Sequence, residues 1–206
     1  MRLRQPASRA AEVSALRRRL RSEPASPITD EERALAAEVA RAKLAAAAAI
    51  GSAASCGSCA VRHPWPVGGF AGGACCAGAT ADLFDDHELA ALAGAGTGPL
   101  DLRPPRGRDA HAGCAFRGAE ACSLALEHRP ARCVHYACDA LRAELHRRGR
   151  LDDVEARLAE LDRAMRAFTA VHRARQDREV LAPVLEAVAE AARRGRPSPR
   201  STQIET

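Results

Sequence analysis

The stretch "TDEERALAAEVARAKLAAAAAI", residues 29–50, carries the clearest structural signal in the chain. Thr29 followed three residues later by Glu32 forms a capping box, and further acidic residues occupy the first turn. The helical pattern continues through the alanines and ends before Gly51. We therefore predict a helix over residues 29–50.

Further helical segments lie on both sides of this one. We expect them at residues 9–21, 82–93, 131–149, 151–171 and 181–188. Within residues 151–171 the apolar residues alternate at spacings of three and four, which is typical of a packing seam or a short coiled coil. The residues of this seam are Leu151, Val154, Leu158, Leu161, Met165 and Phe168.

The segments define a domain organisation. Residues 1–27 form an N-terminal arm, flexible or a short helix, without a convincing apolar face, and residues 28–149 combine a helix with all the cysteines. We predict that residues 150–195 form a C-terminal helical pair and that residues 196–206 form a disordered tail. The predicted fold class is mostly α, with helices framing an irregular, cysteine-rich metal-binding centre.

Composition excludes several classes of protein. The 206 residues carry a net charge of +5, and Lys43 is the only lysine. The excess of arginine and alanine is typical of a GC-rich, bacterial genome, so we do not take arginine as a nucleic-acid signal. The longest apolar run, "LAAAAAI" at residues 44–50, falls far short of the ~20 residues of a membrane span. With no signal-peptide pattern at the N-terminus, we expect a cytoplasmic protein without a membrane partner.

The eight cysteines all lie within residues 56–138, a segment rich in glycine and proline. Cysteines that only fill a core would be scattered along the chain. Because cytoplasmic thiols stay reduced, clustering there favours metal ligation over disulfides. The candidate ligands are Cys56, Cys59, Cys75, Cys76, Cys114, Cys122, Cys133 and Cys138.

The spacing of the cysteines refines this prediction. Cys56 and Cys59, in "CGSC", form a turn that presents two sulfurs to one ion. Side chains of neighbouring residues diverge, so the adjacent cysteines of "GACCAG" either serve two metals or divide between ligation and packing. Cys133 and Cys138 would be about 140° apart on one helix. We therefore expect Cys133 before that helix and Cys138 on its first turns.

These motifs, with "CAFRGAEACSLALEHRPARCVHYAC" at residues 114–138, resemble the CxxCxxCC family, the YkgJ-like cysteine cluster proteins, which chelate zinc or iron. In that family a CxxC and a vicinal CC open the domain, and a segment of the form C-x-F, C, R-P, C and C closes it. The resemblance implies that all eight cysteines are metal ligands and that the cofactor is an iron–sulfur cluster or zinc. The wider group also includes a flagellin lysine-N-methylase.

Other residues near the cysteines have two readings each. His111 and His135 are either ligands or surface residues, and Trp65 is a packing anchor or a partner contact. Three arginines among the cysteines either offset the charge of a polythiolate centre or are solvated. Asp85, Asp86 and Glu88 are expected on a helix surface. The three arginines are Arg117, Arg129 and Arg132.

Three hypotheses for function follow. The first is a metal-binding protein that coordinates an iron–sulfur cluster or zinc through thiolates. The second is an enzyme that uses such a centre on a protein or small molecule, although no catalytic residue can be named. The third is an interaction module that uses zinc only to fold. A protein partner or a second copy of the chain is expected to bind through residues 151–171.

Overall fold

The computed structural model describes residues 8–22, 28–58, 80–105, 114–118 and 122–194. The described residues are mostly helical, which confirms the mostly α part of the predicted class, while the metal-binding centre stays a prediction. Among these residues the only β-type pairing is an isolated bridge between Arg117 and Cys122. The chain divides into two compact units, residues 1–169 and residues 170–206.

The helices in chain order are α1 (Arg9–Ser22), α2 (Asp30–Ile50), α3 (Ala54–Ser58), α4 (Thr80–Leu83), α5 (Asp86–Gly94), the 3₁₀ helix η3 (Leu126–His128), α6 (Ala131–His135), α7 (Asp139–Arg147) and α8 (Leu151–Arg194). Helix α2 begins with the predicted capping box. The Thr29 hydroxyl accepts a hydrogen bond from Glu32 N at 3.1 Å, and the Thr29 amide donates to the Glu32 carboxylate at 2.8 Å. It ends at Gly51, whose positive φ of 63° suits glycine.

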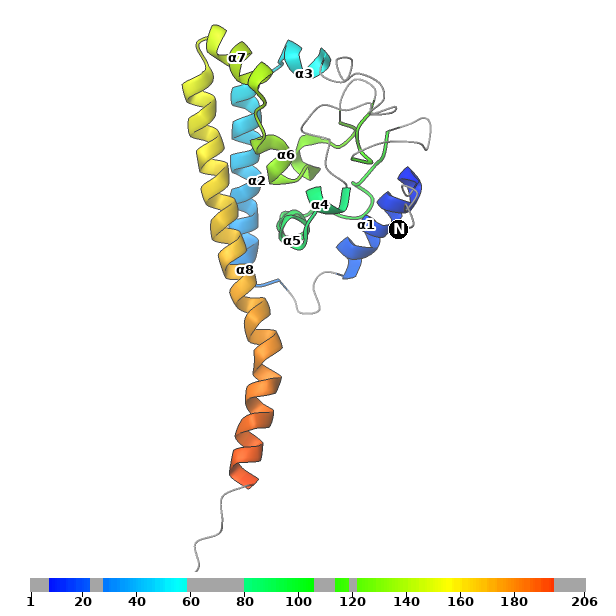
Figure 1. Ribbon diagram of the computed structural model, residues 1–206, viewed down its shortest axis with the longest axis vertical. Helices are drawn as coiled ribbons and strands as arrows, with labels where there is room; N and C mark the ends of the chain where they lie inside the picture. The colour runs from blue at the N-terminus through cyan, green and yellow to red at the C-terminus, as the bar shows by residue number, and fades with distance from the viewer. Residues whose placement is uncertain (1–7, 23–27, 59–79, 106–113, 119–121, 195–206) are drawn as a thin grey trace, which may run out of the picture. The chain divides into compact units, whose positions relative to one another are not determined.

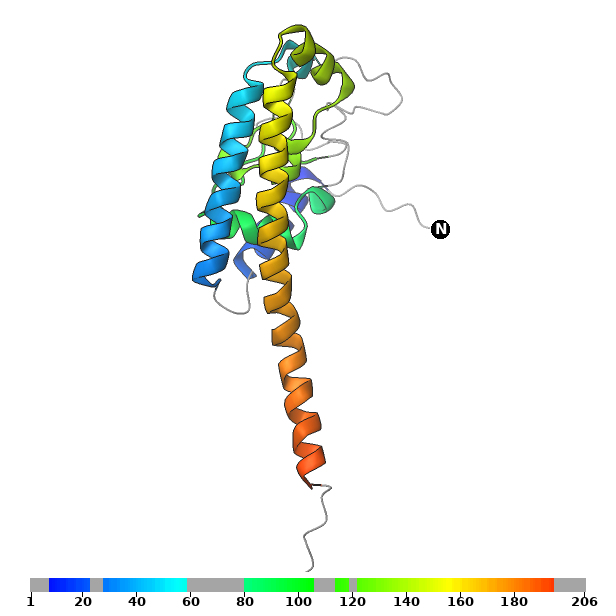
Figure 2. The same ribbon diagram turned by 90° about the vertical axis from the view of Figure 1, so that its left-hand side faces the viewer.

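The main core of the first unit lies between α2, α5, α6, α7 and residues 151–169 of α8. Helix α2 and this part of α8 run side by side in opposite directions (Figures 1 and 2). The seam residues Val154, Leu158, Leu161 and Phe168 are all buried in this core. The packing alternative for the seam is therefore confirmed, while binding of a partner through residues 151–171 stays a prediction.

A second apolar cluster joins α1 to α4, α5 and the described segments 114–118 and 122–124. Val13, Leu16 and Leu20 of α1 are buried there beside Phe84 and Phe116, whose ring centroids are 5.4 Å apart. The expectation that residues 1–27 lack an apolar face is therefore wrong for α1. The three apolar residues of α1 are spaced three and four positions apart, so they lie on one face of the helix and bury that face in the cluster.

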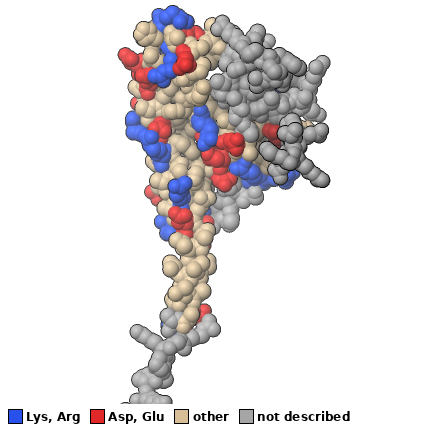
Figure 3. All heavy atoms as spheres, in the orientation of Figure 1, with Lys and Arg blue, Asp and Glu red and all other residues tan. Residues whose placement is uncertain are grey.

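Helix α8 is one continuous helix, whereas we had predicted a helical pair. Pro183 lies inside this helix, in the part that belongs to the second unit. Around Pro183 the large apolar residues are exposed, and the face of this part of α8 seen in Figure 3 shows few charged side chains. These residues are Val180, Leu181, Val184, Leu185 and Val188. Among the described helices, none combines the length and apolarity that a membrane span requires.

Candidate metal centre

Cys114 and Cys122 belong to a compact turn that other elements hold in place. The turn is closed by hydrogen bonds from Arg117 N to Cys114 O at 3.1 Å and from Ser123 N to Phe116 O at 2.8 Å. The amide of Ala115 donates to the Thr80 hydroxyl of α4 at 2.9 Å. Hydrogen bonds from other parts of the chain thus hold backbone around Cys114 and Cys122 that has no regular secondary structure, and they fix the positions of the two thiols.

Helix α1 holds the same turn from the other side. The Arg9 guanidinium donates to the carbonyl oxygens of Ala115 and Arg117, at 2.8 and 3.0 Å. Arg17 donates to Leu102 O at 2.8 Å. The N-terminal helix is therefore part of the framework around Cys114.

The Cys114 side chain is 5 % exposed and lies within the second apolar cluster. Burial raises the pKa of its thiol to about 11, because the apolar surroundings penalise the thiolate. A nearby Cys122 adds to this effect, whereas a hydrogen bond from the Phe116 amide opposes it. The nearby Arg9 guanidinium also opposes the rise in the pKa of Cys114, but the effect of burial is larger.

Cys133 lies in α6, directly after a turn that Lys43 of α2 binds. The Lys43 ammonium is 2 % exposed and donates to the carbonyl oxygens of Glu127 at 2.7 Å and Arg129 at 2.8 Å. Burial lowers the pKa of Lys43 to about 8, while the negative charges of Glu88, Glu127 and the ionised Cys133 oppose that change. Lys43 thus satisfies the carbonyls at the end of η3.

Glu88 of α5 binds the amides on the other side of this turn. Its carboxylate accepts hydrogen bonds from Ala131 N at 2.7 Å and Arg132 N at 3.0 Å, which are the first amides of α6. Burial raises the pKa of Glu88, and these two backbone hydrogen bonds oppose the rise. The expectation that Glu88 lies on a helix surface is wrong, because its carboxylate is buried as the cap of α6. Asp85 caps α5, and Asp86 is paired with Arg19 at 2.7 Å.

Cys56 and Cys138 lie near α7. The Glu144 carboxylate of α7 accepts hydrogen bonds from Ala54 N at 3.1 Å and Ser55 N at 2.9 Å, which fix the start of α3 and with it Cys56. These bonds lower the pKa of Glu144 to about 2. Cys138 stands at the N-cap of α7 and packs against the main core.

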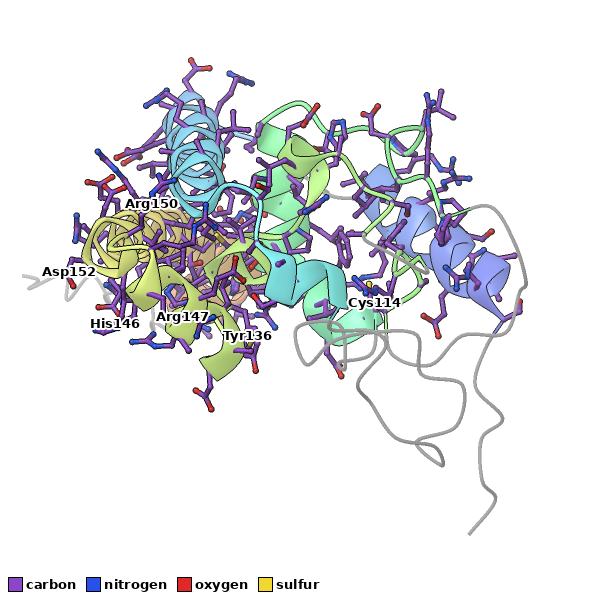
Figure 4. All side chains as sticks on the ribbon, turned by 90° about the horizontal axis from the view of Figure 1, so that it is seen from above. Cys114, Tyr136, His146, Arg147, Arg150 and Asp152 are labelled. Atoms are coloured by element: carbon purple, nitrogen blue, oxygen red, sulfur yellow. The ribbon has the colours of Figure 1, made fainter. Side chains whose placement is uncertain are left out.

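The predicted helix over residues 131–149 is interrupted. It divides into α6 and α7, and the backbone becomes extended at Tyr136, with φ −74° and ψ 112°. Cys133 therefore lies within a helix rather than before it, and Cys138 lies just ahead of α7. Figure 4 shows Tyr136 beside α7 and Cys114 toward α1.

The three arginines near the cysteines are bound to the protein. Arg129 donates to Leu124 O at 2.9 Å, Arg117 is 8 % exposed, and Arg132 contacts Asp82 O, Asp85 and Glu88. The alternative that these arginines are solvated surface side chains is therefore wrong for Arg117, which is buried. Arg132 and Glu88 also line an open cavity of about 320 Å³, together with His87 and His135. No pattern in the sequence predicted this cavity.

Within the described part of the chain, no three His, Cys, Asp or Glu side chains come together as a group that could hold a metal ion. Of the eight predicted ligands, Cys56, Cys114, Cys122, Cys133 and Cys138 are described. Cys59, Cys75, Cys76, Trp65 and His111 lie outside the described residues. The eight-cysteine centre therefore stays a prediction.

Comparison with family models, with curated proteins and with solved structures gives no match to the chain. The resemblance to the cysteine cluster proteins thus rests on the motifs of the sequence.

Proposed function

We propose that the chain is a metal-binding protein that coordinates iron, as an iron–sulfur cluster, or zinc through thiolates of its cysteine-rich segment. One observation carries the proposal: backbone segments that contain or lead into cysteines are held by side chains of other helices. Arg9 and Thr80 hold the turn of Cys114, Lys43 and Glu88 hold the turn before Cys133, and Glu144 holds the start of α3. Such outside support is what a metal-ligand set requires for defined geometry.

The chemistry of the donors suits these metals, since thiolates favour zinc and iron–sulfur clusters. The geometry of the described cysteines is incomplete as a site, because no group of three metal-binding side chains forms among them. Cys114 and Cys122 lie in the second apolar cluster, whereas Cys138 packs against the main core. A complete centre therefore needs Cys59, Cys75 or Cys76.

Binding is a better proposal than catalysis. Two buried charged groups near the cysteines, Lys43 and Glu88, are occupied by backbone hydrogen bonds. Groups committed in this way are suited to holding structure rather than to attacking a substrate or transferring a proton. Enzymatic activity and an interaction role remain alternative proposals.

Anaerobic purification followed by elemental analysis and absorption spectroscopy tests the proposal. We expect iron or zinc in the purified protein, with a visible charge-transfer absorption that bleaches on reduction if the metal is an iron–sulfur cluster. Cys138→Ser should lower the metal content, whereas Val180→Ala, a change at an exposed side chain of the second unit, should preserve it. A reduced, folded protein that contains neither metal would refute the proposal.

A further inference from the structure

Lys43 and Glu88 bind backbone groups on opposite sides of Pro130, in the turn that leads into Cys133. Lys43 comes from α2 and binds carbonyl oxygens, and Glu88 comes from α5 and binds amides. Pro130 itself is fully buried between them. The two side chains thus form a clamp of opposite charges around one buried turn.

The clamp is costly if its purpose is stability alone. Burying an ammonium and a carboxylate costs several kcal/mol per ion, and well-packed apolar residues often stabilise such a position as well. The choice of cation is also specific, because Lys43 is the only lysine among 31 basic residues. An ammonium directs three N–H donors from a single atom, whereas the planar guanidinium of arginine spreads its donors over a wider fork.

Two donors of the ammonium are used by the carbonyls of Glu127 and Arg129. Cys133 N donates to Pro130 O at 3.1 Å, so the thiol-bearing residue is bonded to the clamped turn itself. Movement of the turn would therefore move Cys133.

We propose that Lys43 is a positioning residue for Cys133, because it fixes the turn that leads into this cysteine. Glu88 supports it by holding the opposite side of the turn. The inference rests on the proposed metal-binding function. A group that holds the backbone next to a ligand keeps the ligand sulfur in a defined position.

A double-mutant cycle on the full chain tests this inference. The four proteins are wild type, Lys43→Met, Cys133→Ser and the combined variant, each titrated with Co²⁺ at a temperature where all are folded. Lys43→Met should weaken cobalt affinity by about tenfold and reduce the sulfur-to-cobalt absorption, as expected for a residue that supports a ligand. The combined variant should bind no more weakly than Cys133→Ser, because Lys43 acts through Cys133.

A purely structural role predicts a different result. Val154→Ala, in the main core, serves as a control that destabilises the protein without touching the clamp. Its effect on cobalt affinity, if any, should multiply with that of Cys133→Ser. If the effects of Lys43→Met and Cys133→Ser also multiply, Lys43 does not act through Cys133 and the inference is wrong.

Amide hydrogen exchange in the metal-free protein separates this inference from the proposed function. Lys43→Met should increase exchange at Ala131, Arg132 and Cys133 by about tenfold or more relative to α8, because the turn is released. Val154→Ala should not show this local increase. If the wild-type protein binds no cobalt, the proposed function is wrong. The amide exchange rates of the metal-free proteins then decide whether Lys43 positions Cys133. Unchanged local exchange in Lys43→Met would overturn the inference.

Discussion

Leu16 gives the sharpest test of the role of α1. Its side chain is 2 % exposed in the cluster that contains Phe84, Phe116 and Cys114. Leu16→Ala removes buried methyl groups and leaves a cavity, and such changes cost about 2–5 kcal/mol. Because Arg9 and Arg17 still hold α1 by hydrogen bonds, we expect a loss near the middle of this range, about 3 kcal/mol.

Urea unfolding followed by far-UV circular dichroism measures this loss. In a chain of this size about 3 kcal/mol corresponds to a fall of roughly 6–12 °C in melting temperature. The matched control is Leu181→Ala, the same substitution at a side chain that is 52 % exposed, and it should change stability by less than about 0.5 kcal/mol. Alkylation of Cys114 should also become faster in Leu16→Ala, because loosening of α1 admits water to the cluster.

The result that refutes the reasoning is equal stability of the two variants. Leu16 would then contribute no more than an exposed leucine, and α1 would not be an anchored part of the first unit. Unchanged Cys114 reactivity alongside a large loss of stability would instead show that α1 does not cover the thiol.

Three further predictions concern single positions. Cys114 keeps its proton in the folded state up to about pH 11, whereas the unfolded thiol loses it near its ordinary value of 9.0. The unfolding free energy of the metal-free protein should therefore fall as pH rises from about 9 to 11, and Cys114→Ala should abolish that part of the pH profile. The Glu144 carboxylate stabilises the start of α3 at pH values above its ordinary pKa of 4.5, and this contribution should disappear as pH falls through about 2. Hydrogen exchange at the Ser55 amide measures the loss. In Glu144→Gln the Ser55 amide should exchange without this protection even at neutral pH. Gly94→Ala should lose about 1–3 kcal/mol in thermal unfolding, because an added Cβ would lie 2.8 Å from Ala36 Cβ. A loss no greater than that of Gly98→Ala, where the nearest atom is 3.5 Å away, would contradict the predicted clash.

The helices with local signals were predictable. The capping box of α2 and the apolar spacing of residues 151–168 depend on residues only a few positions apart, so the sequence shows them directly. The continuity of α8 was not predictable, because proline in a helix interior is usually a break. The division between α6 and α7, where the backbone becomes extended at Tyr136, was also missed.

The sequence by itself determined the helical class, the start of α2, the packing seam of α8 and the confinement of all eight cysteines to residues 56–138. Only the tertiary structure decided that α1 is buried, that Cys114 is a core thiol and that Lys43 and Glu88 clamp the turn before Cys133. The physical reason is the range of the interactions. Caps and helical faces form between residues close in sequence, whereas burial and pKa depend on groups that the fold brings together from distant segments.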